Sequence, residues 1–264
     1  MNQTIFERNR AAWNEALEYH QRARNNALQA GFEDPAFSTL DRDCDGILMG
    51  MLDKLDLRGK AIAQLPCNNG RELLSLMRLL GADQAVGFDI SDAAIEEARQ
   101  LAAIAKLNAK FERVNLLELG GEYDNRFDFI YISEGSLQWF PDLDEYFSVV
   151  SRLLKPDGQI LVFEIHPFAY VNGKLKQDPN YATSYFVKGP YSYADGLDYV
   201  GGVSYEAKEC CWFMHKMSDI LGAIRRSGIE LLEFDEYGME MANDPMFQGE
   251  DRYPLSYTVT GRKK

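Results

Sequence analysis

The stretch from Ala61 to Ser91 constrains the fold more than any other part of the chain. It contains a short apolar run, an Asn- and Gly-rich turn, a helical pattern that stops at Gly81, and a second apolar run that ends at Asp89. This order predicts a strand, a tight turn, a helix and a parallel strand, the opening unit of a nucleotide-type α/β sheet. In such sheets, ligands bind at the carboxyl ends of the strands.

The turn in this unit is built from residues that favour unusual backbone conformations. Asn68, Asn69 and Gly70 adopt a positive φ at little cost, so the chain can bend sharply and point free helix N–H groups at an anion. Asp89 follows about one βαβ unit later, where a carboxylate can accept hydrogen bonds from both hydroxyls of a ribose. The two ends of the unit therefore predict an adenosine-containing ligand with an anionic group.

This unit resembles motif I of the class I S-adenosylmethionine (SAM)-dependent methyltransferases, whose loop usually reads Asp/Glu-x-Gly-x-Gly-x-Gly. Here Gln64 replaces the acid, Pro66 and Asn68 replace the first two glycines, and Gly70 keeps the third. Asparagine tolerates the left-handed conformation, so the change from glycine to Asn68 is mild. The changes at Gln64 and Pro66 concern the contacts that the family makes to the methionine end of the cofactor.

The resemblance implies SAM as cofactor and S-adenosylhomocysteine (SAH) as product. The residues expected to bind the cofactor are Gln64, Leu65, Pro66, Asn68, Gly70, Asp89, Ile90, Asn115, Leu116, Ser133 and Glu134. Relatives usually place an aspartate at the position of Asn115, where it accepts from the adenine amino group, and the side chain of Leu116 would pack on the adenine ring. No metal is expected, because transfer from a sulfonium requires none.

Three later segments resemble the same family. The loop 133–143 (SEGSLQWFPDL) resembles the segment after strand four in small-molecule methyltransferases such as the trans-aconitate and malonyl-carrier-protein carboxyl methyltransferases. The segment LLKPDGQILVFE resembles the family's R-x-L-K-P-G-G turn and fifth strand. The runs 229–234 and 253–261 resemble the last pair of strands, of which the final one inserts antiparallel between strands five and six.

The expected fold is α/β: a Rossmann-like, seven-stranded, mostly parallel sheet with an antiparallel last strand and helices on both faces. Residues 1–56 are expected to form an N-terminal helical lid, and residues 57–264 the class I methyltransferase domain. A substrate-lid insertion at 167–214 is rich in rings, and its glycines and prolines favour loops or a short hairpin. The alternative is that most of these rings only anchor a long loop.

The expected substrate pocket draws on the N-terminal helix, the loop 133–143 and the insertion. The helix 4–28 is amphipathic and carries His20 on the same face as Phe6, Trp13 and Leu17. The expected substrate residues are His20, Ser136, Gln138, Tyr185 and Tyr191. Two structural alternatives stay open: the helix packs on the flank of the sheet, and Leu137 and Trp139 fill the core beneath the loop.

Two histidines are candidates for a general base. His166, just past the fifth strand, is the first candidate, and His20 is the second. A purely structural role is the alternative for either. A base is needed only if the acceptor must lose a proton, so a carboxylate acceptor needs none.

The composition excludes several classes of function. A formal net charge of −13 argues against general affinity for nucleic acid or anionic membrane. No apolar run approaches transmembrane length and no signal peptide precedes the helix 4–28, so a cytoplasmic location is expected. The four cysteines lack C-x-x-C spacing and favour buried thiols. The acids Asp41, Asp43 and Asp45 resemble the start of a calcium loop, but Leu52 stands at the position that needs a glutamate.

The sequence thus predicts an enzyme that moves a methyl group from SAM to an oxygen or nitrogen of a small-molecule metabolite, with an aromatic or carboxylic acceptor as the narrower hypothesis. One alternative is a non-catalytic binding or regulatory protein, which the departures at Gln64, Pro66, Asn68 and Asn115 favour. Another is an NAD-dependent dehydrogenase, which would need the spacing G-x-G-x-x-G. Nothing in the sequence indicates the oligomeric state.

Overall fold

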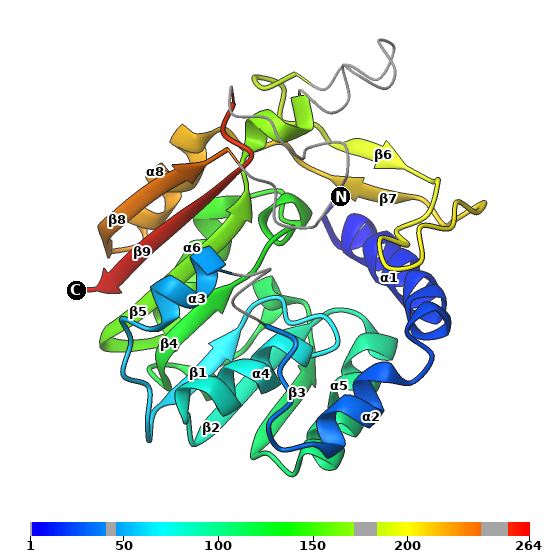
Figure 1. Ribbon diagram of the computed structural model, residues 1–264. Helices are drawn as coiled ribbons and strands as arrows, with labels where there is room; N and C mark the ends of the chain where they lie inside the picture. Colours follow the sequence, from blue (N-terminus) through cyan, green and yellow to red (C-terminus); the bar gives the residue numbers. More distant parts are fainter. Residues whose placement is uncertain (1, 41–45, 172–183, 239–252) are drawn as a thin grey trace. The chain divides into compact units, whose positions relative to one another are not determined.

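The apolar runs of the sequence become the strands of one sheet in the computed structural model (Figure 1), which describes residues 2–40, 46–171, 184–238 and 253–264. Seven strands follow the order β3-β2-β1-β4-β5-β9-β8. They are β1 (Ala61–Gln64), β2 (Gln84–Asp89), β3 (Ala109–Arg113), β4 (Phe127–Ile132), β5 (Leu154–Ile165), β8 (Ile229–Tyr237) and β9 (Ser256–Lys263). The Rossmann-like, mostly parallel sheet expected from the sequence is confirmed.

Two of the described helices end or begin at the capping residues that the sequence predicts. The helices are α1 (Asn2–Arg24), α2 (Ala27–Glu33), α3 (Gly46–Leu52), α4 (Arg71–Leu80), α5 (Asp92–Ala105), α6 (Leu143–Leu153) and α8 (Met217–Arg226). The helix α4 ends at Gly81, whose φ of 67° is the left-handed conformation expected of a glycine C-cap. Ser91 caps α5 by accepting a hydrogen bond from the Ala94 amide at 3.2 Å.

The chain divides into two compact units: Met1–Gly120 with Tyr191–Cys211 (unit 1), and Gly121–Pro190 with Trp212–Lys264 (unit 2). In unit 1, β1 and β3 each pair with β2 in parallel. In unit 2, β4 and β5 are parallel, and β9 is antiparallel to both β5 and β8. This confirms the antiparallel last strand between the fifth and sixth strands.

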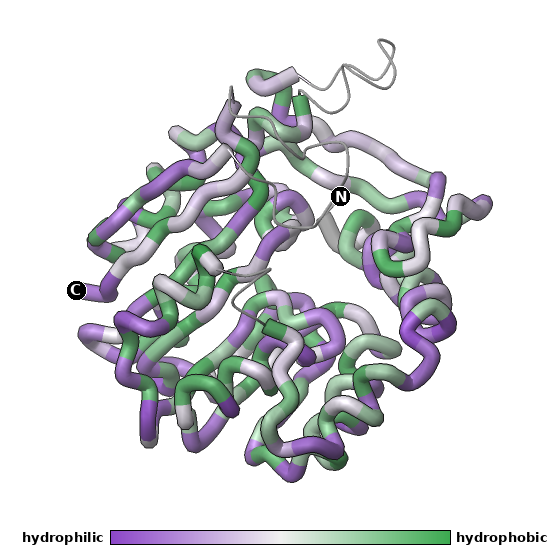
Figure 2. Tube along the Cα trace, viewed as in Figure 1, coloured by the Kyte–Doolittle hydropathy of each residue, from purple (hydrophilic) through white to green (hydrophobic). Residues whose placement is uncertain are grey.

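Unit 1 includes the N-terminal helices and part of the ring-rich insertion. Within the insertion, β6 (Tyr191–Tyr193) and β7 (Cys210–Trp212) form a two-stranded sheet, as expected for a hairpin. In Figure 2 the hydropathy alternates along α1, as expected for a helix with one buried face. The division into a lid at 1–56, a domain at 57–264 and a substrate lid at 167–214 stays a prediction.

Two details differ from the sequence expectation. The helix expected over 4–28 breaks after Arg24, because Asn25 and Asn26 adopt left-handed φ values of 45° and 62°. The Pro-Asp-Gly turn expected before strand five lies inside β5, because Leu154 already pairs with Phe127 and the register shifts afterwards.

Some expectations concern residues outside the part of the chain that the structure describes. These are the acids Asp41, Asp43 and Asp45, the ring of Tyr181, and the stretch 172–183 of the insertion. Among the described helices, none is both long and apolar enough to cross a membrane.

Candidate cofactor site

The loop between β1 and α4 forms the tight turn that its Asn and Gly residues predict. The Gly70 amide donates to the Cys67 carbonyl, and the Cys67 amide donates to the Phe88 carbonyl at the end of β2, both at 2.9 Å. Asn68 and Gly70 adopt positive φ values of 48° and 72°. A Cβ atom at Gly70 would collide with the ring of Phe111 on β3, so this position requires glycine.

Asp89 joins this loop to the end of β2. Its Oδ2 atom accepts from the Asn68 amide at 2.8 Å, and its Oδ1 atom accepts from the Ser91 amide at 2.9 Å. Burial raises the pKa of this carboxyl group, and the surrounding amide donors act in the opposite direction. The Ile90 amide is a third donor to this carboxylate. A carboxylate offers about four lone-pair sites, so Asp89 keeps acceptor capacity for a hydroxyl donor of a ligand.

A second carboxylate lies beside the position where the family motif has its acid. Gln64 donates from Nε2 to Oε2 of Glu72 at 2.8 Å, and Nη2 of Arg71 lies 3.7 Å from the other Glu72 oxygen. Glu72 stands in the first turn of α4, just after Gly70. Sequence reasoning missed this residue, although its place two residues after the motif glycine was a usable signal.

The neighbouring strand β3 contributes Asn115 and Leu116. Asn115 begins a short 3-10 turn, where its Oδ1 atom accepts from the Leu117 amide at 3.3 Å, and Leu116 is buried. The Val114 amide donates to the Asp89 carbonyl at 2.8 Å, which ties the end of β3 to β2. Nine expected cofactor residues of unit 1 thus lie at or just after the carboxyl ends of three neighbouring parallel strands, β1, β2 and β3. These residues are Gln64, Leu65, Pro66, Asn68, Gly70, Asp89, Ile90, Asn115 and Leu116. Their individual contacts to the cofactor stay predictions.

In unit 2, the loop after β4 is organised by Glu164 of β5. Its Oε1 atom accepts from the amides of Gly135 at 2.5 Å and Ile165 at 2.8 Å. Its Oε2 atom accepts from the amides of Ser136 at 2.8 Å and Leu137 at 3.0 Å. Burial raises the pKa of Glu164 to about 7, although these four donors favour the charged form. Sequence reasoning missed Glu164, for which an acid inside the apolar run VFEIH was the signal.

The other expected residues of this loop are Ser133, Glu134, Ser136 and Gln138. Ser136 is buried, and the Gln138 carbonyl accepts from the Phe213 amide at 2.8 Å. Ser133 and Glu134 are half-buried between β4 and the loop. Their roles toward cofactor and substrate stay predictions.

His166 faces a backbone amide at one ring nitrogen and a carboxylate at the other. Nδ1 accepts from the Phe168 amide at 3.1 Å, and Nε2 lies 3.0 Å from Oε1 of Glu236. Burial lowers the pKa of His166, and Glu236 opposes this shift. Because Nδ1 already accepts a hydrogen bond, a role as general base would require this contact to break.

The expected substrate residues are divided between the two units. Tyr185 of unit 2 accepts from the Met217 amide at 3.1 Å, so its hydroxyl anchors α8. Tyr191 belongs to β6 of unit 1 and is half-buried. Among these residues, only His20, also in unit 1, is connected to the motif loop by contacts that the structure shows.

His20 is fully buried on α1. Its Nε2 atom donates to the Leu197 carbonyl at 2.9 Å, and burial lowers its pKa to about 4. Its ring lies 4.5 Å from the ring of Tyr199, centre to centre. Asn68 of the motif loop lies 3.5 Å from the Tyr199 hydroxyl, measured from Nδ2. Tyr199 therefore links the N-terminal helix to the cofactor loop, a role that sequence reasoning did not assign to it.

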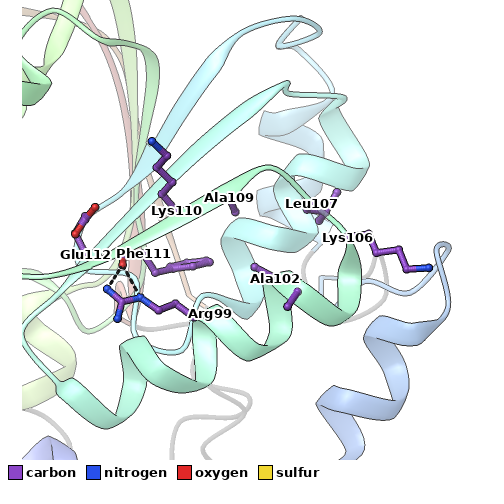
Figure 3. A pocket seen from close by; sticks show the side chains of 9 residues that line it. Arg99, Ala102, Lys106, Leu107, Ala109, Lys110, Phe111 and Glu112 are labelled. Atoms are coloured by element: carbon purple, nitrogen blue, oxygen red, sulfur yellow. Dashed lines mark hydrogen bonds between the residues drawn. The ribbon is translucent and has the colours of Figure 1, made fainter.

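A separate open groove of about 480 Å³ lies between α5 and β3. It is lined by Arg99, Ala102, Ala103, Lys106, Leu107, Ala109, Lys110, Phe111 and Glu112 (Figure 3). The Arg99 guanidinium donates to the Phe111 carbonyl at 3.1 and 2.7 Å, so it is occupied by the backbone. None of the expected site residues lines this groove.

Comparison with known proteins identifies the family. Residues 58–228 match the sequence model of a methyltransferase domain family. The chain therefore belongs to this family, the class I SAM-dependent methyltransferases, whose cofactor is SAM. This confirms the resemblance stated from the motifs and argues against an NAD-dependent dehydrogenase.

Two individual relatives each share less than a third of their aligned residues with this chain. The methyltransferase phqN of Penicillium fellutanum is 28% identical over 183 residues, which cover 68% of this chain and 49% of the relative. The chain thus spans about half the length of this curated relative. The structure of an S-adenosylmethionine dependent methyltransferase from Mesorhizobium loti has a TM-score of 0.59 at 21% identity, covering 83% of this chain and 97% of the other.

Geranyl diphosphate methyltransferase is a further structural relative. Its TM-score is 0.54 at 15% identity, covering 83% of this chain and 77% of the other. At these identities the structural likeness concerns the fold, so the chemistry of this chain has to be argued from its own residues.

Proposed function

We propose that this protein transfers the methyl group of SAM to an oxygen or nitrogen atom of a small-molecule acceptor. One observation carries the proposal: Asp89, buried at the end of β2, holds the Asn68 amide of the motif loop at 2.8 Å, and its three amide donors leave acceptor capacity for a ligand. A protein that had kept the fold without the cofactor would have no need of this buried, incompletely paired carboxylate.

The residues present fit an adenosine cofactor. The lone pairs of Asp89 would accept from the ribose hydroxyls, and Asn115 would accept from the adenine amino group while Leu116 packs on the ring. A side chain at Gly70 would collide with the ring of Phe111, so the loop from Pro66 to Gly70 keeps the tight turn that would present its backbone amides to the cofactor. When bound, SAM supplies an electrophilic methyl group on a good leaving group, so the protein mainly has to align the acceptor and exclude water.

Two observations support a small-molecule acceptor: the net charge of the chain and the substrate of a structural relative. A net charge of −13 disfavours nucleic acid as a substrate and anionic membrane as a partner. One structural relative is named for a small-molecule substrate, geranyl diphosphate. An aromatic or carboxylic metabolite is the narrower proposal, based on the rings near the motif loop. The cytoplasmic location stays a prediction from the sequence.

If the acceptor must lose a proton, His166 and His20 are the candidates to take it. The Nδ1 atom of His166 would first have to release the Phe168 amide. The Nδ1 atom of His20 carries a lone pair, because this ring donates from Nε2, and that lone pair can act as a base only where the cofactor does not use it. His166 and His20 both remain proposals, and a carboxylate acceptor would need neither.

The alternative is a protein of the same fold that binds or regulates without catalysis. The departures at Gln64, Pro66 and Asn68 support it. Glu72 weakens that support, because it brings a carboxylate to the Gln64 side chain at 2.8 Å.

The test is a transfer assay with SAM carrying a radiolabelled methyl group, using phenols, carboxylic acids and amines alongside basic peptides and RNA. We expect label on one class of small molecule and none with the Asp89→Ala variant. Label only on peptides or RNA would refute the small-molecule proposal. Binding of SAH without transfer to any acceptor would favour the regulatory alternative.

A further inference from the structure

Two buried polar atoms on α1 have no hydrogen-bond partner among the described residues. The first is Nδ1 of His20. Since the other ring nitrogen, Nε2, lies 2.9 Å from the Leu197 carbonyl, Nε2 must carry the proton. Nδ1 is therefore a pure acceptor, in a side chain with 0% exposure. A buried acceptor left unpaired is costly, which points to a donor that residues 2–40, 46–171, 184–238 and 253–264 do not supply.

The second atom is Nη1 of Arg24, one helical turn further along the same face of α1. The guanidinium interacts with the Tyr199 hydroxyl and with the distant charge of Glu97, and Arg71 repels it. Nη1 itself is buried without an acceptor from the part of the chain that the structure describes. A desolvated cation in this position favours an anion as its missing partner.

The segment around Tyr199 fixes both atoms beside the motif loop. Asp198 accepts from the amides of Gly201 at 2.8 Å and Val203 at 3.1 Å, so this segment forms a tight turn. The turn places the Tyr199 ring 4.5 Å from His20 and its hydroxyl 3.5 Å from Nδ2 of Asn68. The two unpaired atoms are thus connected to the cofactor loop through one side chain.

The helix that carries them is also fixed. Arg10 binds Asp92 at the start of α5 with two nitrogens, at 2.6 and 3.1 Å. Asn14 donates to the same carboxylate at 3.0 Å and accepts from the Ser91 hydroxyl at 2.7 Å. These contacts hold α1 next to Asp89, so the unpaired atoms are preorganised rather than formed by chance.

The ligand group that complements both atoms has a donor and an anion a few ångströms apart. An α-amino acid group meets this demand, since its ammonium can donate to Nδ1 and its carboxylate can accept from Nη1. A lone hydroxyl would leave the guanidinium charge uncompensated. We propose that His20 and Arg24 bind the amino acid group at the methionine end of the cofactor and so compensate for the changes at Gln64 and Pro66. This inference rests on the proposed function.

The test compares two ligands that share adenosine and a thioether. SAH carries the amino acid group, and 5′-methylthioadenosine lacks it. Both are titrated calorimetrically into the full chain and into Arg24→Met, which keeps the length of the side chain and removes its charge. We expect Arg24→Met to weaken SAH binding about tenfold to a hundredfold and to leave methylthioadenosine binding within about twofold.

Two further variants sharpen the result. His20→Gln keeps a donor for the Leu197 carbonyl and removes the Nδ1 acceptor, so it should weaken SAH about fivefold and spare methylthioadenosine. Arg22→Met is the matched control, because this arginine is exposed on the same helix and its neighbours are Glu18, 3.6 Å away, and the ring of Tyr19, 5.5 Å from the guanidinium carbon. It should change neither affinity. Thermal melting confirms that each variant is folded.

The outcomes separate the two proposals. If the wild-type chain binds neither ligand, the proposed function fails and the inference fails with it. If it binds SAH but Arg24→Met weakens both ligands equally, or weakens neither, only the inference is overturned. A loss of affinity that is confined to SAH supports both the proposed function and the inference about His20 and Arg24.

Discussion

Two buried carboxylates, one in each unit, stand at comparable places and are paired differently. Asp89 ends β2 of unit 1, and Glu164 lies near the end of β5 in unit 2. Each holds the loop that follows a neighbouring strand. Asp89 accepts from three backbone amides, those of Asn68, Ser91 and Ile90, whereas Glu164 accepts from four, two on each oxygen.

The difference separates a binding group from a scaffold group. The four N–H donors around Glu164 use about all the lone pairs of its carboxylate, so it holds its loop and has nothing left for a ligand. Asp89 has lone pairs to spare at the carboxyl edge of parallel strands, where ligands of such sheets bind. Burial and a raised pKa are common to both groups and do not distinguish them.

The largest expected effect comes from Asp89→Ala. Removing two charge-assisted hydrogen bonds to a ribose should weaken SAH binding by about a hundredfold or more, close to 3 kcal/mol, in calorimetric titration. Asp83→Ala is the matched control, because this exposed acid lies just before the other end of β2. Unchanged SAH affinity in Asp89→Ala would remove the distinction between the two carboxylates.

Glu164→Gln should affect stability more than ligand binding. The amide nitrogen would face two of the four N–H donors, so the free energy of unfolding in urea should fall by about 2 kcal/mol. The SAH affinity of the folded variant should fall less than tenfold. Glu233→Gln, at an exposed position of β8, should change stability by less than about 0.5 kcal/mol. A hundredfold loss of SAH affinity in Glu164→Gln would contradict a scaffold role.

The fold was largely predictable because its signals are local. Gly81 and Ser91 mark the ends of α4 and α5, and the apolar run 127–132 is β4 as expected. The extent of β5 was not predictable, since it depends on the pairing of Leu154 with Phe127 across the sheet.

The candidate site was predictable in part. Asp89 and the motif loop follow from spacing, because both lie within one βαβ unit. Glu164 could not be assigned its role, since its donors come from a loop 27 to 29 residues earlier. The contact between His20 and Leu197 joins residues 177 positions apart, and no periodicity encodes it.

Two buried histidines extend the comparison of the units to pH. His20 in unit 1 donates to the Leu197 carbonyl, and His215 in unit 2 donates to the Phe140 carbonyl at 2.8 Å. Burial lowers the pKa of each to about 4. An unfolded histidine takes up a proton near pH 6.5, so stability is lost as the pH falls from about 6.5 toward 4.

Replacing either histidine by glutamine removes this titration. Between pH 8 and pH 5 the wild type should lose about 2 kcal/mol more than His215→Gln, measured by urea unfolding, and a similar amount more than His20→Gln. Equal pH dependence in the wild type and both variants would show that these rings are not buried in the neutral form.

The smallest expected effect concerns the missing acid of the motif. Gln64→Glu restores the family residue but faces Glu72, whose carboxylate now accepts from Gln64 at 2.8 Å. Repulsion should lower the free energy of unfolding at pH 7 by about 1 kcal/mol, and Glu72→Gln in the same chain should restore it. A stabilising effect of Gln64→Glu alone would contradict the account of Glu72 as the replacement acid.

The most direct test of the central claim is the titration of SAH into the unmodified chain. The account predicts one binding site with micromolar affinity, because Asp89, Gly70 and Asn68 keep the geometry of the cofactor loop despite the altered motif. Absence of any binding at millimolar SAH would contradict it and leave a methyltransferase fold that has lost its cofactor.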